Sequence, residues 1–190
     1  MDVKETAKTY PSKKKTYTYA DYLKLPDDRN RYEIIDGELV MTPAPKINHQ
    51  RISGIIELQL RLFVERNDFG EVFDAPFDVF LTDKDIVQPD LLFISSKNKK
   101  IIKEDNIKGV PDLIIEILSP TTAYYDLIEK KELYEKFGVK EYWIVDPKKQ
   151  WIEVYALEEK KYKMHQREEK SGKVNSKVLK GFKLELKQIF

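Results

Sequence analysis

Asp90, Glu116 and Lys130 are the residues whose types could carry chemistry in this chain. Glu116 lies within the apolar run Pro111–Pro120, where an unpaired carboxylate is costly unless it is protonated, paired or bound to a metal ion. Two carboxylates can hold Mg²⁺ and leave positions for water and a phosphate oxygen. A lysine close by can orient that water or stabilise the charge of the transition state. The three side chains are therefore candidates for metal-assisted hydrolysis, and the alternative for Glu116 is a structural ion pair.

Separate elements are expected to bring these three side chains together. The apolar run predicts a fully buried central strand over about residues 112–118. Asp90 is expected on a neighbouring strand, Val87–Ile94, although aspartate is disfavoured inside strands. Lys130 falls in a predicted helix from about residue 123 to residue 137.

Other polar residues near these elements have simpler interpretations. Asp112 shares a strand face with Glu116, but four residues along a strand span about 13 Å, too far for one shared ion. Asp112 is therefore expected to cap the start of the strand. Asp126, Lys130 and Tyr134 are four residues apart and form one helical stripe, which is typical of a solvated, salt-bridging face. Tyr134 is more typical of core packing.

Two further residues are candidates for lining the site. His49 stands near the start of a long predicted helix, Ile47–Arg66, where a lone histidine is more often a hydrogen-bonding surface residue than a ligand. Gln88 lies two positions before Asp90, on the same face of the predicted strand.

The remaining pattern predicts a mixed α and β domain. Residues 1–16 are expected to be a tail or arm, and residues 17–190 a single domain. Asp36-Gly37 predicts a tight hairpin turn between Arg31–Asp36 and Glu38–Met41. A short helix is expected from Thr18 to about Leu25. Further strands are expected over Glu71–Asp74, Phe77–Leu81, Glu141–Val145, Trp151–Leu157, Tyr162–Gln166 and Lys173–Leu179.

Composition limits the possible classes of protein. The chain has 190 residues, a net charge of +1 and no cysteine, which excludes disulfides and cysteine-bound zinc. Near-neutral charge gives no global argument for nucleic-acid binding, although a local basic patch is compatible with it. We find no segment of membrane-spanning length and no signal-peptide pattern, so a cytoplasmic protein without membrane contact is expected.

Five segments resemble, in order and spacing, the Uma-two-type family of restriction endonucleases. They are Tyr32–Leu39, Val87–Leu91, Pro111–Pro120, Asp126–Tyr134 and Glu141–Pro147. That family belongs to the PD-(D/E)XK, or restriction-endonuclease-like, superfamily. The resemblance implies an α/β (α+β) core with a central mixed sheet flanked by helices and with β-hairpins at both ends. It also implies a Mg²⁺ cofactor, with Mn²⁺ as a substitute, and DNA as the substrate of an endonuclease.

The resemblance also assigns roles to individual residues. Asp90 and Glu116 match the two acidic positions of the motif, Glu33 an additional acidic position, and Lys130 a lysine on the helix. Glu33, Asp90 and Glu116 would hold the metal ion or its waters. The chain departs from the superfamily pattern Glu-x-Lys because Leu118 stands where the strand lysine would be. Catalysis therefore requires that Lys130 reach Glu116 from the helix.

The sequence leaves several alternatives open. A catalytically silent nucleic-acid-binding or assembly protein could keep the same fold. A nuclease acting on RNA, or on ends and flaps, would use the same residues. A homodimer is expected by analogy, since two symmetric sites are the simplest way to cut both strands of a duplex.

Overall fold

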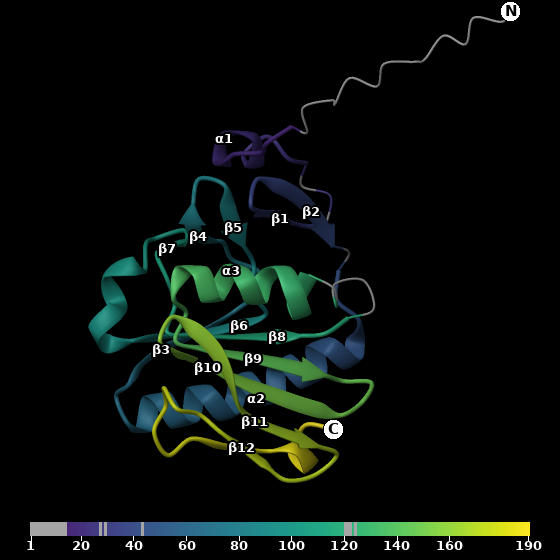
Figure 1. Cartoon of the computed structure of the whole chain (residues 1–190), viewed down its shortest axis with the longest axis vertical. Coiled ribbons are helices and arrows are strands. Elements are labelled where there is room, and N and C mark those ends of the chain that lie inside the picture. Colours follow the sequence, from purple (N-terminus) through teal and green to yellow (C-terminus); the bar gives the residue numbers. More distant parts are fainter. Residues whose placement is uncertain (1–14, 27, 29, 43, 120–122, 124) are drawn as a thin grey trace, which may run out of the picture.

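The computed structural model describes residues 15–26, 28, 30–42, 44–119, 123 and 125–190 (Figure 1). Six strands of this part form the central sheet. In order across the sheet they are β11 (Lys161–Glu169), β10 (Trp151–Glu158), β9 (Glu141–Asp146), β8 (Leu113–Ile117), β6 (Leu91–Ser95) and β3 (Gly70–Asp74). β8 and β9 run parallel, and the other neighbours are antiparallel. The sheet is therefore mixed, as predicted.

A second, smaller sheet lies toward the N-terminal end of the molecule (Figure 1). Its strands, in order, are β2 (Glu38–Thr42), β1 (Arg31–Ile35), β5 (Asp85–Val87), β4 (Val79–Thr82) and β7 (Ile107–Lys108). β1 and β2 form the predicted hairpin, in which Asp36 and Gly37 both have positive φ, 50° and 78°. A type I′ turn requires this conformation, and Asp-Gly supplies it at low cost.

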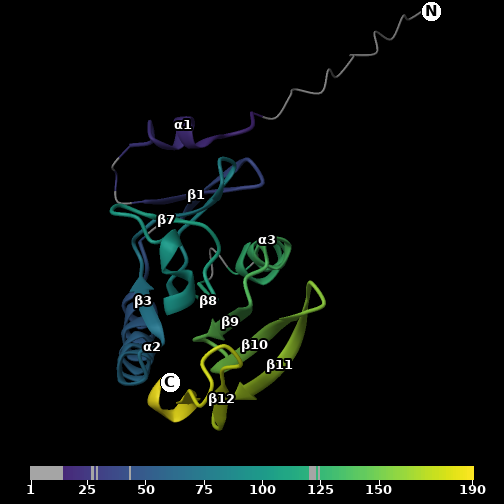
Figure 2. The same cartoon turned by 90° about the vertical axis from the view of Figure 1, so that its left-hand side faces the viewer.

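Helices cover the two faces of the central sheet. α2 (Ile47–Arg66) and α3 (Lys130–Phe137) lie on opposite sides of it (Figure 2). α2 buries one stripe at a spacing of four residues, formed by Ile52, Ile56, Leu60 and Val64. The shorter helical elements are α1 (Tyr19–Tyr22), η1 (Ser96–Ile101), the π-helical turn η2 (Tyr125–Glu129) and η3 (Leu186–Gln188).

The alternation of side chains along β8 decides which face Glu116 occupies. Leu113, Ile115 and Ile117 pack in the core on the α2 side, whereas Ile114 and Leu118 pack in the core that contains α3. Because successive residues of a strand point to opposite faces, Glu116 points toward α3. The pattern that makes β8 a buried strand thus also directs its single carboxylate toward the helix that carries Lys130.

The predicted strand Val87–Ile94 is wrong in one respect. The structure divides it into the end of β5 and the start of β6, which belong to different sheets, with Gln88, Pro89 and Asp90 as the connection. Pro89 cannot donate to a strand ladder, which explains the break. Asp90 therefore lies just before β6 rather than inside a strand, and Gln88 does not share a strand face with it.

Two other expectations need correction. The helical segment before Lys130 is a π turn, and its stripe of Asp126, Lys130 and Tyr134 is buried rather than solvated. The predicted strand Lys173–Leu179 is shorter in the structure, where β12 (Lys173–Asn175) pairs with β13 (Lys183–Glu185) in a terminal hairpin. The predicted arm lies outside the described residues except for residues 15 and 16. No described helix is long and apolar enough to cross a membrane.

Candidate active site

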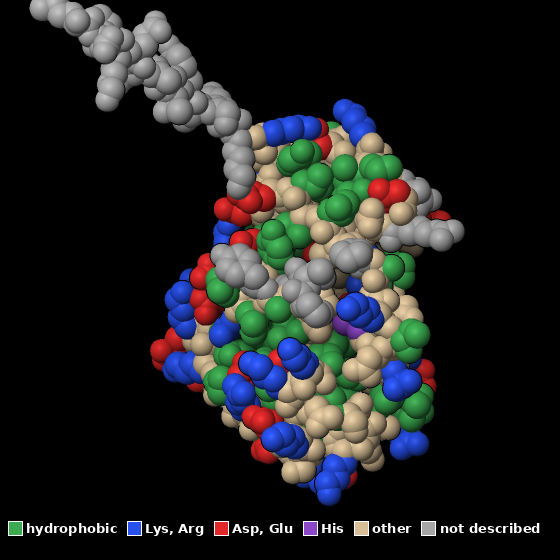
Figure 3. Space-filling view, turned by 90° about the vertical axis from the view of Figure 1, so that its right-hand side faces the viewer, with side chains coloured by type: hydrophobic (Ala, Val, Ile, Leu, Met, Phe, Trp, Pro, Cys, Tyr) green, Lys and Arg blue, Asp and Glu red, His purple; other side chains and the backbone are tan. Residues whose placement is uncertain are grey.

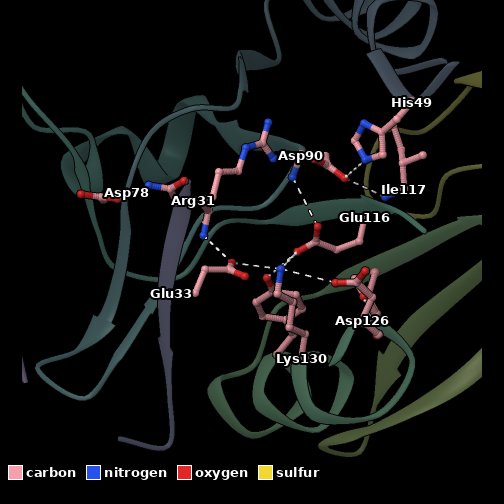
Figure 4. A network of polar contacts seen from close by, with 12 residues as sticks. Arg31, Glu33, His49, Asp78, Asp90, Glu116, Ile117, Asp126 and Lys130 are labelled. Carbon is pink, nitrogen blue, oxygen red and sulfur yellow. Dashed lines mark hydrogen bonds and ion pairs between the residues drawn. The ribbon is translucent and has the colours of Figure 1, made fainter. Parts of the chain in front are cut away.

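The ammonium group of Lys130 lies at the centre of the buried polar cluster drawn in Figure 4. Its Nζ atom is 2.9 Å from Glu33 Oε1, 3.0 Å from Glu116 Oε1 and 3.4 Å from Asp126 Oδ1. Burial alone would lower the pKa of Lys130, but the surrounding carboxylates outweigh it and hold the pKa well above its usual range. Lys130 is therefore a permanent cation, and it reaches Glu116 from the helix.

Three elements position the groups around this ammonium. The hairpin strand β1 supplies Glu33, β8 supplies Glu116, and the turn η2 supplies Asp126 one turn before Lys130. The Tyr134 hydroxyl donates to Glu116 Oε1 over 2.9 Å, and the Gln88 backbone N–H donates to Glu33 Oε1 over 2.7 Å. Glu116 and Glu33 are thus each held by a second donor besides Lys130.

Asp90 lies directly beside Glu116 but in different surroundings. The Asp90 backbone N–H donates to Glu116 Oε2 over 3.4 Å. Asp90 Oδ2 accepts from Ile117 N over 2.9 Å and lies 3.0 Å from His49 Nε2, while Oδ1 is 3.0 Å from Arg31 NH1. Asp90 therefore has Arg31 and N–H donors beside it, whereas Glu116 shares the single cation Lys130 with two other acids, Glu33 and Asp126.

The two neighbouring carboxyl groups consequently have opposite pKa shifts. Burial raises the pKa of Glu116 most, Lys130 opposes the rise and the nearby acids add to it, so the pKa lies well above its usual range. Burial alone would also raise the pKa of Asp90, but His49, the Ile117 N–H and Arg31 hold it below its usual range. A pair of acids with pKa values pushed apart is a frequent property of active sites.

The sequence-predicted residues come together, and two site residues were missed. Glu33, Asp90, Glu116, Lys130, His49 and Gln88 all line one pocket of about 100 Å³, together with Asp126 and Arg31. Tyr134 contacts the site through Glu116. Asp126 was visible only as part of the i, i+4 stripe, whose burial the sequence does not reveal. Arg31 carried no signal, because basic residues are common in exposed hairpins.

Asp112 lies apart from this pocket, as its spacing predicts. Its carboxylate accepts from Ser95 N over 2.8 Å and is ion-paired with Lys140. Burial alone would raise the pKa of Asp112, but these bonds hold it below its usual range. Asp112 is therefore a structural acid just before the strand that carries Glu116, and it serves as a matched control for substitutions in the pocket.

The donor atoms of the pocket suit a hard cation. Four carboxylates face three permanent cations across the lining, and oxygen is the ligand that Mg²⁺ prefers. Within the described part of the chain, the buried atoms His49 Nδ1 and Gln88 Oε1 have no hydrogen-bond partner, so water or a ligand would satisfy them. No three acidic or histidine side chains of the described residues already converge on one point. The carboxylates contact cations instead, Lys130 among Glu33, Glu116 and Asp126, and Arg31 beside Asp90.

The surface around the pocket mixes apolar and basic side chains. On the face shown in Figure 3, hydrophobic side chains gather around the grey residues, with lysines and arginines interspersed. Exposed apolar residues adjoin the lining in sequence, namely Met41, Ile47 and Leu127. Positive charge at the entrance therefore comes from a few side chains, among them Arg31 and Lys46.

Comparison with known proteins gives three findings. A family model described as "Uma2: Putative restriction endonuclease" matches residues 19–187. An uncharacterized Synechocystis protein, sll1609, is 25% identical over 142 residues, which cover 70% of this chain and 76% of that protein. The crystal structure of a "putative nuclease belonging to DUF820" from Anabaena variabilis has a TM-score of 0.75 at 22% identity, covering 91% of this chain and 97% of that one.

Proposed function

The chain belongs to the Uma2 family, described as restriction endonucleases, and from this premise we propose that it is a metal-dependent endonuclease that hydrolyses phosphodiester bonds in DNA. The observation that carries the proposal is the contact between Lys130 and Glu116. The missing strand lysine and the near-neutral charge favour a catalytically silent protein. The contact of Lys130 with Glu116 supports the proposal that the helix lysine serves in place of the strand lysine.

Asp90 and Glu116 are the residues that would hold a Mg²⁺ or Mn²⁺ ion, since the Asp90 backbone N–H contacts the Glu116 carboxylate and both residues line the pocket. Such an ion, when bound, polarises the phosphodiester and lowers the pKa of a water molecule toward neutrality. Metal ligands must be deprotonated, so the raised pKa of Glu116 would weaken metal binding as the pH is lowered. Glu33 would hold Lys130 or one of the ion's waters.

The other side chains of the pocket can act on the water, the substrate or one another. Lys130 remains charged and can stabilise negative charge that develops in the transition state. It can donate to the attacking water only in exchange for one of its three carboxylate contacts. Glu33 and Asp126 fix the direction of that ammonium. Tyr134 fixes Glu116 Oε1. A two-fold dimer, with one such site for each strand of a duplex, remains a prediction.

Substitution of Asp90 by asparagine, compared with Asp112→Asn, tests this function. Purified protein is incubated with supercoiled, linear and single-stranded DNA, and with RNA, in Mg²⁺, Mn²⁺ or EDTA. We expect wild type and Asp112→Asn to cut DNA only when the metal ion is present. Asp90→Asn is expected to lose about 10²-fold or more in rate, the size of effect that follows removal of a preorganised electrostatic group.

Two results would count against the proposal. Equal cutting by Asp90→Asn and wild type would remove the pocket from the reaction. If folded wild-type protein binds DNA but cuts it under none of these conditions, the silent binding protein would be favoured. Cutting of RNA in preference to DNA would keep the site and change its substrate.

A further inference from the structure

Arg31 is a partly exposed cation of the pocket that contacts Asp90. It begins β1, and its side chain is 22% exposed, against 5% for Lys130. Its guanidinium reaches into the site beside Asp90 (Figure 4). Arg31 also lines a second hollow of about 220 Å³ that runs along α2 and shares Pro45, His49 and Asp90 with the pocket. Arg31 therefore stands where the candidate active site opens onto the surface.

The contact between Arg31 and Asp90 involves one guanidinium nitrogen and one carboxylate oxygen. NH1 of Arg31 meets Asp90 Oδ1 at 3.0 Å, and this is the single ion pair of the guanidinium among the described residues. The other oxygen, Oδ2, is the one that accepts from His49 and the Ile117 N–H. A guanidinium has five N–H donors in a planar fork, so most of the donor capacity of Arg31 remains for another anion. Lys130 lacks this freedom, because three carboxylates enclose it.

A divalent cation on Asp90 would compete with Arg31 for the same carboxylate. Both positive groups neutralise Asp90, and like charges in a small pocket repel each other strongly. A phosphodiester brought to the site would offer Arg31 a new anion with the geometry that guanidinium groups bind best, two parallel N–H···O bonds. The exposed position of Arg31 allows this exchange without opening the Lys130 cluster.

We propose that Arg31 exchanges partners, neutralising Asp90 in the metal-free protein and binding a backbone phosphate of the nucleic acid in the loaded site. This role rests on the proposed nuclease function. In it, Arg31 is the residue that couples binding of the metal ion to binding of the substrate. Arg31 has two opposing effects, because it weakens binding of the metal ion and strengthens binding of DNA. A residue that only held Asp90 in place would instead strengthen binding of the metal ion and of DNA alike.

The test uses full-length Arg31→Ala and Arg31→Lys, with Arg51→Ala as the matched control. Arg51 is an exposed arginine on α2 outside both hollows. Isothermal titration with Mn²⁺ alone measures metal affinity. Fluorescence anisotropy of labelled DNA in Ca²⁺, at several salt concentrations, measures substrate affinity. Circular dichroism and thermal melting report the folded fraction of each variant.

Arg31→Ala is expected to bind Mn²⁺ about threefold to tenfold more tightly, since one competing charge is gone. The same variant is expected to bind DNA about tenfold or more weakly, the usual loss for a hydrogen bond to a charged group. For DNA binding by this variant, the slope of log association constant against log salt concentration should be shallower by about 0.7–0.9, the contribution of one phosphate contact. Arg31→Lys should keep the salt slope, and Arg51→Ala should match wild type.

Weaker Mn²⁺ binding by Arg31→Ala, with unchanged DNA affinity, would overturn the exchange and make Arg31 a support for Asp90. If Arg31→Ala does not fold, the uncharged Arg31→Gln takes its place, and unchanged metal and DNA affinities in Arg31→Gln at unchanged stability would also contradict the exchange. Failure of the nuclease proposal is distinguishable, because wild type itself would then show no Mn²⁺ binding that depends on Asp90.

Discussion

Replacing Glu116 by glutamine is expected to abolish DNA cleavage and leave the protein at least as stable as wild type. Glutamine has the same shape and keeps one oxygen to accept from Lys130 and Tyr134, but it is a poor ligand for a hard cation. We expect single-turnover cleavage in Mg²⁺ to fall by about 10²- to 10³-fold, as when a preorganised electrostatic group is removed.

The stability of Glu116→Gln follows from the charges around it. Glu116 faces Glu33, Asp126 and Asp90, and its raised pKa shows that the buried site disfavours its charge. Removing that charge relieves repulsion, so urea unfolding at pH 8 should give a free energy of unfolding equal to that of wild type or about 1 kcal/mol higher. A variant that loses cleavage because it unfolds would contradict this explanation.

Glu141→Gln is the matched control for this substitution. Glu141 is a buried glutamate on the neighbouring strand β9 and accepts from Trp143 Nε1 and from the backbone N–H groups of Lys177 and Val178. It lies outside the pocket. Its replacement should lower the free energy of unfolding by about 1–3 kcal/mol, because N–H donors lose a charged acceptor. Cleavage by the folded protein should persist, the reverse of the pattern for Glu116→Gln.

Replacing Lys130 by methionine is expected to cost about 3–5 kcal/mol of stability at pH 8. The substitution removes the cation from among three buried carboxylates and leaves their charges uncompensated. Chemical denaturation with urea, followed by circular dichroism, measures the loss. Stability within about 1 kcal/mol of wild type would mean that the carboxylates are neutral in the folded protein and that the ion-pair description is wrong.

The stability of Lys130→Met should depend on pH in a defined direction. Without the ammonium, the pKa values of the buried acids rise above their unfolded values of about 4, so the folded state binds protons more readily than the unfolded state. Stability should therefore increase as the pH is lowered from 8 to about 5.5, more steeply than in wild type. The double variant Lys130→Met, Glu116→Gln should recover part of the loss, since one buried charge has been removed.

The fold could be predicted from the sequence where hydrophobic pattern and turn chemistry agree. The run Leu113–Ile117 forms the buried strand, Asp36-Gly37 forms the hairpin turn, and the four-residue spacing of apolar residues gives α2. The mixed sheet and the family resemblance are confirmed. The break at Pro89 was missed, because the apolar residues on both sides continue one pattern across two sheets.

The candidate site was predictable in part, for a physical reason. The resemblance and the i, i+4 spacing pointed to Lys130. Spacing along a helix shows which residues share a face, but it does not show whether that face is buried or exposed. Whether Asp126 faces solvent or β8 depends on how α3 packs on the sheet, which is a tertiary property. Arg31 and His49 reach Asp90 from a hairpin and from α2, elements remote from it in sequence. Such contacts leave no trace in local pattern.

The most direct test of a metal-dependent site between Asp90 and Glu116 is a crystal structure of the wild-type protein soaked in Mn²⁺, with data collected for anomalous scattering. We predict an anomalous peak within coordination distance of carboxylate oxygens of Asp90 and Glu116. Arg31 is expected to have moved away from Asp90. Crystals of Glu116→Gln treated in the same way are expected to show no peak in the pocket. An ion bound elsewhere, or an empty pocket in crystals whose protein binds Mn²⁺ in solution, would contradict the account.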